Sequence, residues 1–136
     1  MDRPGSASPG SSPLPNPKRP VLLIVDDDSE VLRALVFLTR ARGFDVRHCG
    51  TSAEALAATV ENLHCLVIDQ NLPDQTGIEL LRGMRERGVT APAVIITTAP
   101  SAALVRQAAA VGAPIVEKPL LDEALFTQIA DLTRAG

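Results

Sequence analysis

Four short apolar runs in this chain each end in side chains that can take part in chemistry. Runs of this length, rich in Val and Ile, are typical of buried parallel strands. The carboxyl ends of such strands meet at one edge of an open α/β sheet, where ligands bind. We therefore expect one site with Asp69 at its centre. The runs and the groups that follow are 21–25 before Asp26, Asp27 and Asp28, 65–68 before Asp69, 93–96 before Thr97 and Thr98, and 115–116 before Glu117 and Lys118.

Asp26, Asp27 and Asp69 would bring three negative charges to this edge. Without a counterion, repulsion raises the pKa of at least one of these carboxyl groups. A divalent cation removes the repulsion, and Mg²⁺ prefers carboxylate oxygens, waters and phosphate oxygens. Three consecutive aspartates are also typical of a solvated turn in which Asp28 or Ser29 caps a helix. The second acid-ended strand favours the metal site.

Lys118 is the only lysine after residue 20. Its compact ammonium can contact a phosphate as a point charge, where Arg would act as a wide fork. A single lysine is usually a surface residue, but a position between a buried strand and Pro119 favours a role at the site. Thr97 fits either an ordinary β-branched strand residue or a hydroxyl donor at the same edge.

The segments between these runs have the apolar spacing of helices, so strands and helices alternate. Thr51 with Glu54 and Thr76 with Glu79 match the capping box that begins a helix. The alternation predicts an α/β fold, a doubly wound sheet of five parallel strands with five helices. Residues 44–48 alternate apolar and polar, as an edge strand does. The helices are expected at 29–42, from the first capping box to about 61, from the second to about 87, and at 101–111 and 121–133.

Composition indicates one globular domain, 20–136, after a disordered tail, 1–19. Six Pro, four Ser and two Gly occupy twelve of the first twenty positions, and such a segment cannot bury enough surface to fold. The domain has no Trp or Tyr, so its core must be aliphatic. Cys49 and Cys65 lack metal-ligand spacing, and we expect two buried, reduced thiols in a cytoplasmic protein. No apolar run approaches the roughly 20 residues of a membrane span.

Residues 20–134 resemble the receiver domain of two-component response regulators, a flavodoxin-like fold. Each supporting motif is weak alone, but all four in this order and spacing are specific. They are Val25-Asp26-Asp27-Asp28, Ile68-Asp69-Gln70-Asn71-Leu72-Pro73 with Gly77 four residues later, Ile96-Thr97, and Glu117-Lys118-Pro119.

The resemblance implies that Asp69 accepts a phosphoryl group from a sensor histidine kinase or a histidine phosphotransfer protein. The domain would not be an enzyme in the ordinary sense, although it would assist its own phosphorylation and dephosphorylation. It would signal through a downstream protein partner, without binding DNA directly, and homodimer formation stays open. The implied Mg²⁺ ligands are Asp27, Asp69 and the backbone carbonyl of Asn71, with Asp26 acting largely through water; Thr97 and Lys118 would bind the phosphoryl oxygens, and Lys118-Pro119 would be a cis peptide.

The sequence departs from the family pattern at three places. Thr98 stands where the family usually has Gly or Ala, and Ile115 stands where many members have Tyr or Phe. The segment 112–118 is one residue short. An aromatic rotamer switch is therefore absent, and any output signal must use other residues.

Two other classes of function stay open at this point. The domain could be a phosphate sink or relay intermediate without its own output. It could also be a flavodoxin-like enzyme or cofactor-binding domain. Three aspartates after the first strand would repel a flavin phosphate. Asp26-x-Asp28 matches the motif of aspartate-dependent phosphatases, but their other parts are missing.

Overall fold

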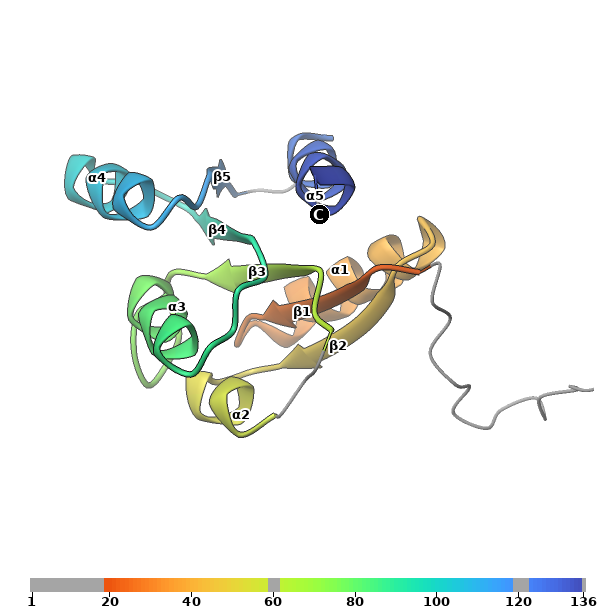
Figure 1. Ribbon diagram of the computed structural model, residues 1–136, viewed down its shortest axis with the longest axis horizontal. Helices are drawn as coiled ribbons and strands as arrows, with labels where there is room; N and C mark the ends of the chain where they lie inside the picture. The colour runs from red at the N-terminus through yellow and green to blue at the C-terminus, as the bar shows by residue number, and fades with distance from the viewer. Residues whose placement is uncertain (1–18, 59–61, 119–122, 136) are drawn as a thin grey trace, which may run out of the picture.

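The computed structural model describes residues 19–58, 62–118 and 123–135 (Figure 1). The predicted tail, apart from residue 19, and the predicted cis peptide at Pro119 lie outside these ranges. Within these ranges ten elements alternate strictly between strand and helix, as the sequence predicts. They are β1 (Val21–Val25), α1 (Ser29–Ala41), β2 (Asp45–Cys49), α2 (Ser52–Ala57), β3 (Cys65–Asp69), α3 (Gly77–Glu86), β4 (Ala93–Thr97), α4 (Ala102–Ala110), β5 (Ile115–Glu117) and α5 (Ala124–Ala135).

The five strands form one parallel sheet in the order β2-β1-β3-β4-β5. The predicted doubly wound fold is confirmed, and β2 is an edge strand as its alternating pattern indicates. β3 is the central strand, so its last residue, Asp69, lies at the middle of the sheet edge. From β1 the chain first adds β2 on one side and then β3 on the other, so the switch point of the sheet lies between β1 and β3, where such sheets bind ligands.

Helices cover both faces of the sheet (Figure 1). Alternate strand residues point to opposite faces, so β3 sends Leu66 and Ile68 into one core and Cys65 and Val67 into the other. The first core packs against α2, α3 and α4, and the second packs against α1 and α5. Every residue of β1, β3 and β4 is buried, which explains why these strands are continuous apolar runs.

Local sequence signals determine where most helices begin. Thr51 with Glu54 and Thr76 with Glu79 form the predicted capping boxes. The side chain of Asp28 caps α1 by accepting hydrogen bonds from the backbone N–H groups of Glu30 and Val31. Asp28 therefore has the capping role that the sequence allows, while Asp26 and Asp27 remain available for the site.

The prediction that α2 extends to about residue 61 is wrong. The helix ends at Ala57, and Ala58 has an extended backbone with a ψ of 101°. Only Ser52 and Ala55 of this helix are buried, so little packing energy favours further turns. None of the helices in the described ranges is long and apolar enough to cross a membrane.

Cys49 and Cys65 are both free thiols. Cys65 is buried as predicted, but Cys49 is only half-buried because it ends the edge strand β2. Burial raises the pKa of the Cys65 thiol to about 12. Burial, together with the negative charge of Glu54, raises the pKa of Cys49 to about 11. Both groups are therefore protonated at neutral pH, which does not favour nucleophilic chemistry.

Candidate functional site

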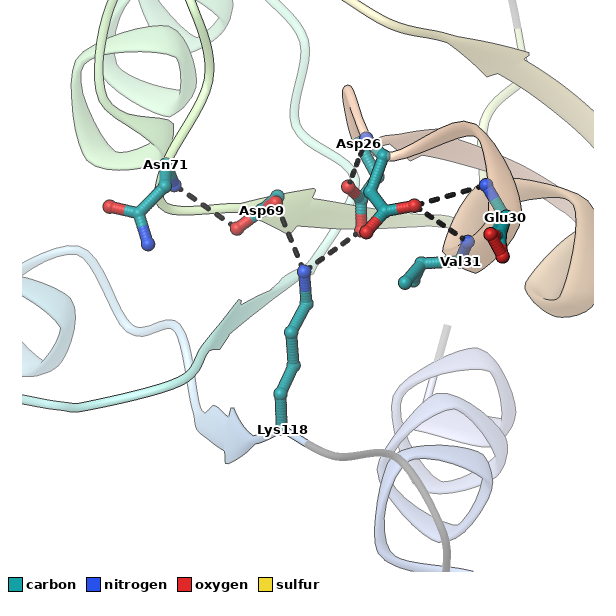
Figure 2. Close-up of polar contacts among 7 residues, drawn as sticks. Asp26, Glu30, Val31, Asp69, Asn71 and Lys118 are labelled. Atoms are coloured by element: carbon teal, nitrogen blue, oxygen red, sulfur yellow. Dashed lines mark hydrogen bonds and ion pairs between the residues drawn. The ribbon is translucent and has the colours of Figure 1, made fainter.

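The structure brings the predicted site residues to one edge of the sheet. Asp69 and Thr97 are the last residues of β3 and β4, while Asp26 and Lys118 directly follow β1 and β5. Figure 2 shows the Lys118 side chain extended toward the carboxylates of Asp26 and Asp69. These residues are far apart in the sequence, and the parallel sheet alone places them together.

Three carboxylates form a cluster at this edge. One oxygen each from Asp26, Asp27 and Asp69 lie within 4.8 Å of one another. Asp26 and Asp69 are buried, with exposed fractions of 0% and 3%, whereas Asp27 is exposed. Hard oxygen donors at this spacing, open to solvent on one side, fit a Mg²⁺ ion that keeps several waters.

Burial and the neighbouring charge of Asp69 raise the pKa of Asp26 to about 6. The backbone hydrogen bond from Asp28 and the charge of Lys118 act in the opposite direction but are outweighed. Asp26 Oδ1 accepts that hydrogen bond from the Asp28 N–H at 3.0 Å. Its buried Oδ2 has no hydrogen-bond partner within the described ranges, although it lies 3.2 Å from the Lys118 amine. An under-satisfied buried oxygen facing two other carboxylates is a further observation that fits a cation.

Lys118 supplies the positive charge of the cluster. Its Nζ lies 3.1 Å from Asp69 Oδ2 and 3.2 Å from Asp26 Oδ2. Burial of the amine disfavours its charge, but the two carboxylates outweigh this effect and raise the pKa of Lys118. The amine therefore stays protonated, and it partly neutralises two buried acids.

The loop after Asp69 is folded back onto the start of α3. Asp69 Oδ1 accepts a hydrogen bond from the backbone N–H of Asn71 at 3.1 Å. Gln70 accepts from Gly77 through its carbonyl and from Ile78 through its side chain. A Cβ atom on Gly77 would lie 2.6 Å from the carbonyl oxygen of Asp69. Only glycine permits α3 to approach the end of β3 this closely.

Sequence reasoning missed a contact between this loop and α2. Asp74 accepts hydrogen bonds from the backbone N–H groups of Ser52, at 3.1 Å, and Ala53, at 2.9 Å, one to each carboxylate oxygen. Hydrogen bonds from the Ser52 side chain and backbone lower the pKa of Asp74 to about 2. Asp74 follows Pro73, and this pair indicates only a turn. No sequence signal identifies Ser52, 22 residues earlier, as its hydrogen-bond partner.

The two threonines at the end of β4 differ in burial. Thr97 is 3% exposed, and its carbonyl accepts the backbone N–H of Lys118 at 2.7 Å. Thr98 is exposed. The position of Thr97, fixed to Lys118 beside the end of β3, is compatible with its predicted role.

The family model described as the response regulator receiver domain matches residues 22–130. This chain is a member of that family. Domains of this family are phosphoryl acceptors in two-component signalling, receive the group from histidine kinases and bind Mg²⁺ at an acidic pocket.

Curated relatives of this receiver domain are transcriptional regulatory proteins. FixJ of Rhizobium meliloti (strain 1021) is 33% identical over 109 residues, which cover 78% of this chain and 53% of FixJ. KdpE of Mycobacterium tuberculosis is 38% identical over 78 residues, which cover 57% of this chain and 34% of KdpE. The receiver domain thus spans between about a third and about half of the length of these relatives.

Solved receiver domains share the fold. The receiver domain of the Francisella response regulator 1452 has a TM-score of 0.78 at 23% identity, covering 86% of this chain and 98% of that one. FixJ-N has a TM-score of 0.75 at 29% identity, covering 86% and 95%. The predicted receiver topology is therefore confirmed.

Proposed function

We propose that Asp69 accepts a phosphoryl group from the phosphohistidine of a sensor histidine kinase or a histidine phosphotransfer protein. The observation that supports this role is the position of the Asp69 carboxylate, at the end of the central strand. It lies 3.1 Å from the Lys118 amine and within 4.8 Å of oxygens of Asp26 and Asp27. A nucleophilic carboxylate with cationic charge on one side and metal ligands on the other suits phosphoryl transfer.

In the proposed reaction, a carboxylate oxygen of Asp69 attacks the phosphorus atom in line with the leaving nitrogen. The new O–P bond forms as the P–N bond breaks, and the imidazole leaves with the electron pair and is neutral if its other nitrogen keeps its proton. The product is an acyl phosphate on Asp69. Both Asp69 oxygens have protein partners, the Asn71 N–H and the Lys118 amine, which hold the carboxylate in place before attack.

The proposed Mg²⁺ ligands are the carboxylates of Asp27 and Asp69 and the backbone carbonyl of Asn71, with Asp26 contributing largely through water. The ion supplies neutralisation of negative charge on the phosphoryl oxygens. Asp27 is exposed and Asp26 is buried, which suits a direct ligand role for Asp27 and a water-mediated role for Asp26.

Lys118 and Thr97 are proposed to bind the oxygens of the transferred group. Lys118 can exchange its contact with Asp69 Oδ2 for a phosphoryl oxygen without leaving the site. The hydroxyl of Thr97 would bind a second oxygen. The same groups would assist hydrolysis of the acyl phosphate by water, which is the sense in which the domain assists its own dephosphorylation.

We propose that a downstream protein partner in the cytoplasm receives the signal. The net charge of −3 and the acidic site argue against DNA binding by this domain alone. A phosphate sink or relay uses the same acceptor chemistry and differs only in what happens after Asp69 is phosphorylated.

Phosphoramidate with Mg²⁺ provides a test that needs no cognate kinase. Intact mass spectrometry should show one added phosphoryl group on the wild-type chain and none on Asp69→Asn. Asp45→Asn, which changes an acid at the start of the edge strand β2, is the matched control and should react like the wild type. Uptake by Asp69→Asn at the wild-type rate would exclude Asp69 as the acceptor.

A further inference from the structure

Asp74 joins two elements that no strand pairing connects. It lies in the loop between β3 and α3, and its carboxylate accepts the first two backbone N–H groups of α2. Ser52 is 2% exposed, so the donor of one of these hydrogen bonds is buried, although Asp74 itself is exposed. A charged acceptor that binds two N–H groups at a helix start forms a strong, oriented contact.

The loop that Asp74 holds is attached at its two ends and at two points between them. Asp69 and Gln70 anchor its beginning, through the Asn71 N–H and the start of α3. A single antiparallel bridge between Asn71 and Thr76 closes its neck. Between these two residues, Leu72 packs against the first core, and within the described ranges the contact of Asp74 with α2 is the hydrogen-bonded attachment to another element.

Helix α2 is itself a firm support for this contact. Ala55 is buried against the core, and Arg87, next to the end of α3, donates a hydrogen bond to the carbonyl of Leu56 at 2.9 Å. The helix also has its own cap, because Thr51 accepts the N–H of Glu54. The start of α2 therefore stays helical through Thr51, and Asp74 attaches the loop to a helix that is already fixed.

We infer that Asp74 is a positioning residue, which holds the β3–α3 loop against α2 so that the backbone carbonyl of Asn71 is placed for Mg²⁺. This inference rests on the proposed function, because Asn71 is a proposed ligand. Mg²⁺ demands near-ideal octahedral geometry, so a small displacement of one rigid ligand weakens binding. Residues that orient metal ligands typically change metal affinity by about 10- to 100-fold when they are removed.

The test compares two caps of the same helix. Asp74→Ala removes the contact between loop and helix, whereas Thr51→Ala removes a cap of α2 without touching the loop. Isothermal titration with Mg²⁺ should show about tenfold weaker binding for Asp74→Ala and unchanged binding for Thr51→Ala. Asp74→Asn keeps one oxygen acceptor and should give an intermediate affinity. Melting temperatures of all three variants separate positioning from loss of stability.

A second measurement is made without metal. Amide hydrogen exchange of Asn71, whose N–H binds Asp69, should be several-fold faster in Asp74→Ala and unchanged in Thr51→Ala. Wild-type Mg²⁺ affinity in Asp74→Ala, or equal weakening by Thr51→Ala, would overturn the inference. If the wild-type chain binds no Mg²⁺, the proposed function fails, and unchanged Asn71 exchange in Asp74→Ala would then overturn the positioning role separately.

Discussion

The amine of Lys118 lies 3.1 Å from Oδ2 of Asp69, although 49 positions separate the two residues in the sequence. The same amine lies 3.2 Å from Oδ2 of Asp26. One cation therefore balances two buried acids, and a net negative charge remains at the site. This imbalance prepares the site for an added cation and makes its energetics sensitive to pH and to metal.

Stability of the metal-free domain should depend on the charge of Asp26. Its pKa in the folded state is about 6, above the ordinary value of 3.8. The folded state thus binds more protons than the unfolded state between these values, and stability falls as pH rises from about 4 to about 6. Asp26→Asn lacks this loss, so its advantage over the wild type should grow with pH, by on the order of 2 kcal/mol.

Urea unfolding followed by circular dichroism, with a chelator present, checks this at pH values from about 4 to about 7.5, which span the pKa values of Asp26 in the unfolded and folded states. The difference between Asp26→Asn and the wild type is the relevant quantity, because other titrating groups cancel. A difference that stays constant with pH would show that Asp26 does not titrate in this range.

Asp27 and Asp28 are adjacent exposed aspartates with separate expected roles. Asp27→Ala should weaken Mg²⁺ binding by at least about tenfold, since a ligand is lost, with metal-free stability unchanged. Asp28→Ala should lower stability by about 1 kcal/mol, because the cap of α1 is lost, with Mg²⁺ binding unchanged. Calorimetric titration and urea unfolding of both variants check this prediction. Weaker Mg²⁺ binding in Asp28→Ala with lower stability in Asp27→Ala would contradict it.

Gly77 should tolerate no side chain. In Gly77→Ala, the new Cβ would lie 2.6 Å from the carbonyl oxygen of Asp69, so α3 or the loop must move. We expect a loss of about 2 kcal/mol in stability and slower phosphorylation by phosphoramidate.

Gly83→Ala is the matched control within the same helix. There the added Cβ would meet its nearest atom, on Leu56, at 3.7 Å. Replacing glycine inside a helix should raise stability by up to about 1 kcal/mol. Equal effects of the two substitutions, measured by thermal unfolding, would contradict a steric requirement at Gly77.

Thr97 should transmit phosphorylation to the following loop and helix. The beryllofluoride adduct of the wild type should shift backbone amide resonances from residue 97 through 116, because the hydroxyl must turn toward the fluorine atoms that replace the phosphoryl oxygens. Thr97→Ala should bind beryllofluoride but lose most shifts beyond the loop, and Thr97→Ser should keep them. Thr98→Ala is the control. If Thr98→Ala loses the shifts and Thr97→Ala keeps them, Thr98 is the switch.

Sequence patterns predicted the fold, and they predicted that the proposed site residues lie at one edge of the sheet, because the strands and their ends have local signals. Continuous apolar runs indicated buried strands, and the residues after them had to meet at one sheet edge. The capping boxes at Thr51 and Thr76 depend on neighbours three residues away, so they were also visible.

Other features depend on the packed structure and left no local signal. Asp26 and Asp27 are adjacent and chemically identical, yet one is buried and the other exposed. The contact of Asp74 with α2 requires the loop and the helix to be placed by different strands. The end of α2 at Ala57 likewise reflects weak packing rather than a stop signal.

The sheet order has a consequence for synthesis of the chain. β1 pairs with both β2 and β3, so the first half of the domain can begin to assemble as it leaves the ribosome. Asp26 follows β1 and Asp69 ends β3, so both acids belong to that assembly, whereas Lys118, whose amine contacts them, follows β5 and is made later. An N-terminal half alone would hold both acids without this cation. We therefore expect the nascent domain to become fully stable only after Lys118 and the core residues of α5 emerge, so the lysine of the proposed site also contributes to the last stage of folding.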